Sequence, residues 1–333
     1  MSNTPIIEAR GLTKRFVKTL DLAGRIAARL GGAGRDEVVH AVDHVDLTIR
    51  RGEVVGLVGE SGCGKSTLGR MIAGILPPTE GQVLYKGTDR ATLATADAKA
   101  ARLAVQMIFQ DPSSSLNPRL RVEESVGEAP AVHGLVSKAG LAAYVDDILT
   151  RVGLDPQLKR RYPHQFSGGQ RSRIGIARAL AVKPEFLVCD EAIAALDVSI
   201  QAQVINLFMD LRRDFDLTYL FISHDLGVVQ HIADRIVIMY LGRVVEAGPT
   251  DQLFASPNHP YARALLDEVP RVGRVKRQFK PIVGEIPSPL NPPSGCHFHP
   301  RCPHAMAKCR EVAPPLVEIA PGRVAACHLN VQT

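Results

Sequence analysis

The sequence predicts an α/β protein built on a largely parallel sheet, followed by a small irregular C-terminal region. Short apolar runs typical of buried strands alternate with helix-length segments up to about residue 250. A glycine-rich turn that ends in Lys-Ser separates the first of these runs from a helical pattern. Beyond residue 250 the chain becomes proline-rich, as in "GEIPSPLNPPSG", and loses its periodicity.

Each expected strand is a mainly apolar run of four to six residues, and these runs lie at 54–59, 104–109, 186–189, 219–223 and 235–240. Between the strands expected at 186–189 and 219–223, the segment "SIQAQVINLFMDLRRD" is typical of a helix with one apolar face. That face consists of Ile200, Val204, Leu207, Phe208 and Leu211. Residues 17–40 interrupt two strand-like segments, and we interpret them as a partly helical surface insertion.

Composition is that of an ordinary globular protein, with 333 residues of which 45% are hydrophobic. No apolar run reaches the roughly 18 residues of a membrane span, and the N-terminus lacks the pattern of a secretory signal. We therefore expect a cytoplasmic protein. The net charge of +6 arises in residues 271–333, which hold nine basic and three acidic residues. Such a tail indicates either nucleic acid, anionic lipid or another anion as a partner, or simply a solvated surface.

The segment "GESGCGKST", residues 59–67, fits the phosphate-binding pattern GxxxxGK[ST] and stands between a strand and a helix. Its glycines let backbone N–H groups surround phosphates at the positive end of the helix. Lys65 is expected to reach the β- and γ-phosphates and Ser66 to bind Mg²⁺. The residues predicted to contact nucleotide here are Gly59, Ser61, Gly62, Cys63, Gly64, Lys65, Ser66 and Thr67.

Acidic residues follow the buried strand of "FLVCDE". Asp190 is placed to hold the Mg²⁺ water shell, and Glu191 to polarise an attacking water as general base. Two further polar residues end strands: Gln110, a candidate for sensing Mg²⁺ or the water, and His224, a candidate contact for the γ-phosphate. Together these residues predict nucleotide hydrolysis.

A second anion-binding device occurs in "FSGGQRSRIGIARAL", residues 166–180. A helix is expected to begin with Ser167, Gly168, Gly169 and Gln170, and no bulky side chain covers its first backbone N–H groups. Because the chain already has one phosphate cradle, this second device predicts that two chains share each nucleotide.

These segments together resemble the ATP-binding subunit of ABC transporters, and most closely that of oligopeptide/dipeptide permeases. The segments that carry the closer resemblance are "MIFQDPSSSLNPR", "RYPHQFSGGQRSR", "HPYARALL" and "GEIPSPLNPPSGCHFHPRC". The resemblance implies a P-loop NTPase fold of the ABC type, with a parallel core sheet, an antiparallel β subdomain and a helical signature subdomain at about 111–180. It divides the chain into a nucleotide-binding domain, 1–250, and a C-terminal domain, 251–333.

The resemblance also implies roles for individual residues. Residues 59–67 become Walker A, Gln110 the Q-loop, Ser167–Gln170 the signature, and Phe186–Asp190 with Glu191 Walker B. Asp197 ends the D-loop, His224 is the H-loop, and Phe16 lies where the family stacks an aromatic ring on adenine. Site residues of the Mg²⁺ ion are then Ser66, Gln110 and Asp190.

The implied activity is ATP hydrolysis that powers import of oligopeptides or dipeptides. The implied partners are a second ATPase subunit, often a different chain, two membrane permease subunits and an extracytoplasmic binding protein. ATP would close the two ATPases head-to-tail at the cytoplasmic face of the inner membrane. Import of nickel or another small solute stays open, since the ATPase does not touch the solute. A soluble, nucleic-acid-associated ABC protein is a further alternative, although the basic tail lacks interleaved aromatic residues.

One segment departs from the family pattern. Where relatives usually have DEP-[TV]-SALD, this chain has "DEAIAALD", with Ala192 in place of Pro and Ala194 in place of Ser. The acidic pair and Asp197 are retained, so the chemistry should remain. Loss of the proline, which fixes backbone φ, is expected to alter the stiffness of the segment and so the turnover rate or the coupling between sites.

Four cysteines gather near the C-terminus at Cys296, Cys302, Cys309 and Cys327, around the segment "GCHFHPRCPHAMAKC". A reducing cytosol disfavours disulfides among them. Their wide spacing lacks the close ligand pairs of zinc fingers, and four thiolates are typical of iron–sulfur sites. The resemblance points the same way, to a structural [4Fe–4S] cluster; zinc and no metal are the alternatives. Cys63 and Cys189, in the phosphate loop and in a strand, are not expected to be ligands.

Overall fold

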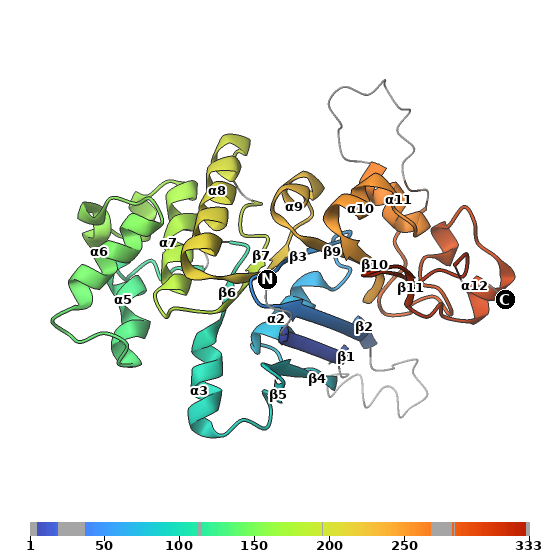
Figure 1. The fold of residues 1–333 in the computed structure, drawn as a ribbon, viewed down its shortest axis with the longest axis horizontal. Coiled ribbons are helices and arrows are strands. Elements are labelled where there is room, and N and C mark those ends of the chain that lie inside the picture. Colours follow the sequence, from blue (N-terminus) through green and yellow to red (C-terminus); the bar gives the residue numbers. More distant parts are fainter. Residues whose placement is uncertain are drawn as a thin grey trace, which may run out of the picture.

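The computed structural model describes residues 5–18, 37–111, 115–194, 196–267, 282 and 284–330. Most of the expected surface insertion, 19–36, lies outside these ranges. The described residues form an eight-stranded sheet, a four-stranded sheet and the helices that cover them (Figure 1). The prediction of an α/β fold is confirmed.

The larger sheet has the strand order β11-β12-β10-β9-β3-β8-β7-β6. Its strands are β3 (Val54–Val58), β6 (Val105–Ile108), β7 (Phe186–Asp190), β8 (Thr218–Ile222), β9 (Arg235–Tyr240), β10 (Arg243–Pro249), β11 (Val317–Ala320) and β12 (Arg323–Ala325). The five central strands, from β9 to β6, pair in parallel, as the alternation of strands and helices predicted. β10, β12 and β11 continue the sheet as antiparallel strands. The C-terminal region is therefore not wholly irregular, because two of its strands extend the core sheet.

The smaller sheet is antiparallel and has the order β2-β1-β4-β5. It consists of β1 (Pro5–Lys18), β2 (Glu37–Arg50), β4 (Glu80–Tyr85) and β5 (Thr88–Asp89). This is the antiparallel β subdomain that the family resemblance implied.

The helices separate into groups along the long axis of the molecule (Figure 1). α5 (Val122–Val132), α6 (Leu141–Arg151) and α7 (Gly168–Leu180) gather at one end, within the expected helical subdomain. The core sheet carries α2 (Lys65–Ala73), α3 (Thr95–Ala104), α8 (Val198–Phe215) and α9 (Leu226–Ile232). α10 (Thr250–Ala255), α11 (Pro260–Asp267) and α12 (Ala307–Glu311) lie toward the other end. Within the described part of the chain, none of these helices has the length and hydropathy needed to cross a membrane.

Both faces of the core sheet are buried. On β3, Val54 and Val58 belong to the hydrophobic cluster beneath α7 and α8, whereas Val55 and Leu57 belong to the cluster shared with α2 and the smaller sheet. This explains why the strand is apolar at consecutive positions instead of alternating with polar residues. The predicted apolar face of α8 packs on the first cluster, with Val204 and Phe208 fully buried.

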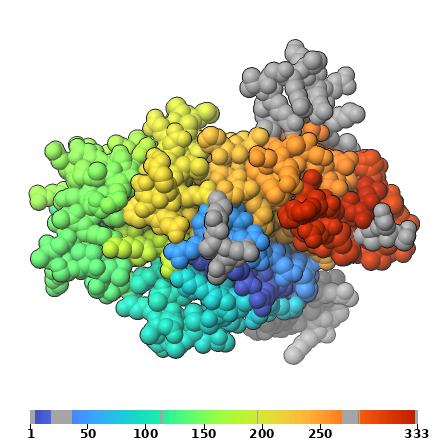
Figure 2. Space-filling view, viewed as in Figure 1, coloured from blue at the N-terminus to red at the C-terminus, as the bar shows by residue number. Residues whose placement is uncertain are grey.

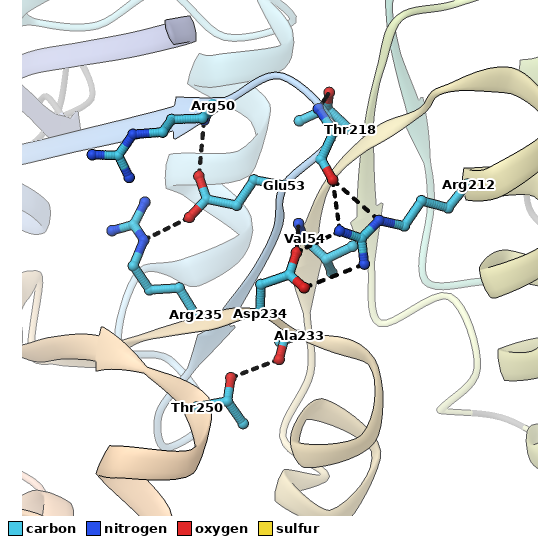
Figure 3. A network of polar contacts seen from close by, with 10 residues as sticks. Arg50, Glu53, Val54, Arg212, Thr218, Ala233, Asp234, Arg235 and Thr250 are labelled. Carbon is cyan, nitrogen blue, oxygen red and sulfur yellow. Dashed lines mark hydrogen bonds and ion pairs between the residues drawn. The ribbon is translucent and has the colours of Figure 1, made fainter. Parts of the chain in front are cut away.

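A polar network joins the segments at the amino end of the parallel strands (Figure 3). The Arg212 guanidinium of α8 donates to the Gly52 carbonyl, at 2.6 and 3.1 Å, and to the Asp234 carboxylate, at 2.6 Å. Asp234 also accepts the Val54 N–H at 2.8 Å. Glu53 accepts from Arg235 of β9 at 2.8 Å. The network holds β3 against α8 and β9 at the edge opposite to the glycine-rich turn.

We expect Arg212→Ala to lower the free energy of unfolding by about 2–4 kcal/mol, because it leaves the Gly52 carbonyl and the Asp234 carboxylate without a charged partner. Urea denaturation of the purified chain measures this. The matched control is Arg213→Ala, whose side chain is 73% exposed against 17% for Arg212. That change should cost no more than about 0.5 kcal/mol. Equal losses from the two variants would contradict this role for Arg212.

Candidate nucleotide site

The glycine-rich turn connects the end of β3 to the start of α2 and has a backbone that only glycine fits. Gly59, Gly62 and Gly64 have φ angles of +151°, +78° and +103°. A Cβ atom at Gly59 would lie 2.2 Å from the Met239 carbonyl oxygen, and side chains rarely adopt these angles. The turn therefore exposes backbone N–H groups at a helix N-terminus, as a phosphate site requires.

Lys65 lies at the first position of α2 with its side chain folded over the turn. Its ammonium donates to the carbonyl oxygens of Gly59, at 2.7 Å, and Glu60, at 2.9 Å. The lysine is buried, so its charge is held inside the turn where phosphates would lie. This position fits the predicted contact with the β- and γ-phosphates.

Ser66 and Asp190 lie side by side, although 124 positions separate them in the sequence. The Ser66 hydroxyl donates to the Asp190 carboxylate at 2.7 Å. Burial raises the pKa of the Asp190 carboxyl, and the hydrogen bond from Ser66 opposes that rise. A hydroxyl and a carboxylate supply the hard oxygen ligands that Mg²⁺ prefers, so this pair fits the predicted metal position.

Glu191 follows directly and meets both other predicted catalytic residues. Its carboxylate accepts from the Gln110 amide at 2.8 Å and lies 3.4 Å from Nδ1 of His224. The residue has a positive φ of 47°, and its N–H donates to the Ile222 carbonyl at the end of β8. This arrangement turns the side chain away from the strand direction, toward Gln110 and His224. Gln110 thus contacts Glu191, the predicted general base, while Ser66 and Asp190 form the predicted Mg²⁺ position.

The second anion-binding device begins α7. The Ser167 hydroxyl accepts the Gln170 N–H at 3.3 Å, and the Gln170 side chain accepts the Ser167 N–H at 3.0 Å. This capping box fixes the first turn of the helix. Ser167 and Gly168 are exposed, and the Ser167 carbonyl accepts the Arg171 N–H at 2.9 Å within the helix. The helix end is therefore ordered yet open to another molecule.

The sequence of this chain matches known protein families. Residues 42–194 match the ABC transporter family model, and residues 245–309 match the model of the oligopeptide/dipeptide transporter C-terminal region. A putative oligopeptide transport ATP-binding protein of Bacillus subtilis, YkfD, is 53% identical over 90% of this chain and 93% of its own. The oligopeptide transport ATP-binding protein AppF of the same organism is 51% identical, over 87% and 90%.

This chain belongs to the ABC transporter family of ATP-binding proteins. Solved structures agree with the assignment. The cbiO1 subunit of an ABC transporter complex from Clostridium perfringens superposes with a TM-score of 0.62 at 27% identity, over 76% of this chain and 92% of that one. A dimeric ATP-binding cassette bound to ADP and phosphate gives 0.61 at 27% identity, over 73% and 98%. The predictions of an ABC-type fold and of ATP as substrate are confirmed.

Two other predicted contacts of this ABC ATPase lie on the surface. Phe16 of β1 is 42% exposed, with the Lys14 ammonium 5.3 Å from its ring centre. The ring is exposed, and its stacking on adenine stays a prediction. Asp197 is exposed at the start of α8. In the segment that departs from the family pattern, Ala192 is buried and its carbonyl accepts from the Ser172 hydroxyl at 3.4 Å. The effect of the missing proline on turnover stays a prediction.

The four C-terminal cysteines line one narrow cavity together with Phe298 and several histidines. Burial raises the pKa of the Cys296 thiol to about 11, and the other three thiols add to the rise. Within the residues that the structure describes, however, no group of three or more Cys, His, Asp or Glu side chains is arranged to hold a metal ion. The four cysteines thus meet at one cavity without the arrangement of a metal site, and the metal centre stays a prediction. Cys63 and Cys189 are buried elsewhere, as expected.

Sequence reasoning missed one part of the site. Glu60, within Walker A, is held by two residues of the C-terminal region, Tyr261 and Arg301. Its position in the variable part of the pattern gave no sign of this, and 241 positions separate Glu60 from Arg301.

We expect Glu191→Gln to bind ATP with unchanged affinity and to lose turnover by about 100- to 10,000-fold, because glutamine cannot accept the proton of the attacking water. Phosphate release and nucleotide binding by the purified, assembled protein measure the two effects. The matched control is Glu185→Gln, just before β7, where Glu185 pairs with Lys86 on the surface. Near-normal hydrolysis by Glu191→Gln would rule out its role as general base.

Proposed function

We propose that this chain hydrolyses ATP to power import of oligopeptides or dipeptides through the cytoplasmic membrane. The observation that carries the proposal is the joining of an ABC-type ATP-binding domain to a C-terminal region of the oligopeptide/dipeptide transporter type. The names of relatives about 50% identical over most of their length support peptide as the solute.

The side chains of the site have complementary roles in the proposed reaction. Lys65 would bind the β- and γ-phosphates, and Ser66 with Asp190 would hold a Mg²⁺ ion, which would offset phosphate charge. Glu191 accepts a proton from water as the water oxygen attacks the γ-phosphorus and the bond to ADP breaks. Gln110 and His224, which contact the Glu191 carboxylate, orient that water and the γ-phosphate.

The proposed assembly follows from the open end of α7. The exposed N–H groups at Ser167–Gln170 of one ATPase would meet the γ-phosphate bound by the other, which completes each site only in a closed pair. The dimeric cassette among the structural neighbours supports such pairing. We propose a second, different ATPase subunit, two permease subunits and an extracytoplasmic binding protein as partners, with this chain at the cytoplasmic face of the membrane.

We expect the isolated chain to hydrolyse ATP slowly and with a rate per chain that rises with concentration, because half of each site comes from another molecule. Addition of the partner ATPase and the permeases in proteoliposomes should raise turnover at least about tenfold. A labelled dipeptide or oligopeptide, delivered by the binding protein, should then enter the vesicles only with ATP.

Each outcome decides one part of the proposal. Full activity from a monomer at any concentration would exclude the shared site. ATP-driven uptake of nickel or another small solute, without peptide, would replace the solute and keep the ATPase. Salt-sensitive binding of nucleic acid by the purified chain, with no effect of permeases on turnover, would indicate a soluble nucleic-acid-associated ATPase instead.

We also propose that Cys296, Cys302, Cys309 and Cys327 ligate a structural [4Fe–4S] cluster, with zinc as the alternative metal. Their convergence on one cavity supports this, although the thiols would have to turn toward a common centre. Such a cluster would add bonds to a region with few apolar residues.

We expect anaerobic purification to yield about four irons per chain, with absorbance near ~400 nm. Cys302→Ser should lose this iron, and Cys189→Ser, in a core strand, should keep it. One zinc per chain and a colourless protein would assign zinc, and a metal-free protein of normal stability would exclude a metal altogether.

A further inference from the structure

An ion pair joins the C-terminal region to the phosphate loop. The Arg301 guanidinium donates to both carboxylate oxygens of Glu60, at 2.7 and 3.0 Å. The Arg301 side chain is only 5% exposed and that of Glu60 is 22% exposed. A two-pronged, largely buried contact of this kind fixes both partners far more strongly than a surface ion pair does.

Aromatic side chains form the wall on which Arg301 lies. The rings of Tyr240, Tyr261 and Phe298 pack with centres 4.7 to 5.4 Å apart. Arg301 lies over the Tyr240 ring at 5.8 Å, and the Tyr261 hydroxyl accepts the Glu60 N–H at 2.9 Å. These three rings come from β9, from α11 and from the cysteine-containing segment 295–309, and they pack next to Walker A. Figure 2 shows that the C-terminal residues, in red, lie directly against the orange segment that contains α11.

Glu60 places a carboxylate inside the phosphate loop. Its carboxylate belongs to the turn that would surround a triphosphate, and like charges closer together than about 8–10 Å repel one another without full screening in physiological salt. A free carboxylate here would therefore oppose ATP binding. Arg301 neutralises the carboxylate and holds it toward the C-terminal region. The Glu60 carbonyl meanwhile accepts from the Lys65 ammonium, so the same residue also helps to place the phosphate-binding lysine.

We propose that Arg301 is a positioning residue for ATP binding: it holds the Glu60 carboxylate away from the bound phosphates and thereby makes the C-terminal cysteine segment a part of the nucleotide site. Arg301 ends the short helix His299–Arg301, between Cys296 and Cys302. Its position thus depends on the fold of that segment. The same segment also contacts the turn after β9, because His297 Nδ1 lies 2.9 Å from the Leu241 carbonyl oxygen. The next residue of that turn, Gly242, donates its N–H to the Cys63 carbonyl of Walker A.

The test is a set of variants of the full chain, with binding of a fluorescent ATP analogue measured in the presence of Mg²⁺. Arg301→Met keeps the apolar contact with Tyr240 and removes the charge. We expect its Kd for the nucleotide to rise about tenfold. In the assembled transporter, KM for ATP should rise by a similar factor while kcat changes by less than about twofold. The matched control is Arg310→Met, an exposed arginine of the same segment, which should bind as the wild type does.

The deciding variant is the double substitution. Glu60→Gln alone should bind nucleotide no more weakly than the wild type, since it removes the opposing charge. Added to Arg301→Met, it should restore Kd to within about twofold of wild type. A mere loss of packing would not be rescued in this way. Wild-type affinity in Arg301→Met, failure of Glu60→Gln to restore binding, or a tenfold loss from Glu60→Gln alone would each overturn the proposal. Glu60→Gln keeps the test valid if Arg301→Met does not fold.

Discussion

The parallel pairing of β3, β8 and β7 positions the nucleotide site. Leu57 of β3 and Asp190 of β7 both pair with Ile222 of β8, so the three strands end at one edge of the sheet. The loops that leave this edge carry Walker A, the acidic pair and His224. A slip of one residue in β7 would turn Asp190 to the opposite face and separate it from Ser66. The chemistry of the site is therefore a consequence of sheet register.

The rest of the structure holds this edge in place from two directions. At the amino end of the same strands, Arg212 and Asp234 join β3, α8 and β9, which fixes the register where no ligand is involved. Beyond β9, the sheet continues through β10 into the strands of the C-terminal region. That continuity places Arg301 against Glu60. The C-terminal region is thus attached to the ATP site through both the sheet and the ion pair.

The parts of the site that sequence predicted are those that local pattern determines. A buried strand, a glycine turn and a helix follow one another around Lys65, and the acids directly follow an apolar run, so periodicity and spacing located them. The contacts that sequence did not predict are between distant segments. β12 is three residues long, without a clear alternation, and the partner of Arg301 depends on how the sheet edge folds back. Sequence placed Gln110 near Mg²⁺ or water, and the structure puts its amide on Glu191.

The most direct test of this account is an experimental structure of the assembled ATPase pair with Mg²⁺ and a non-hydrolysable ATP analogue. We predict the γ-phosphate between Lys65 of one chain and the Ser167–Gln170 helix end of the other, with Mg²⁺ beside Ser66 and Asp190 and the Glu60 carboxylate still paired with Arg301. A nucleotide bound away from the turn at 59–67, or one whose γ-phosphate contacts a single chain in the closed state, would contradict it.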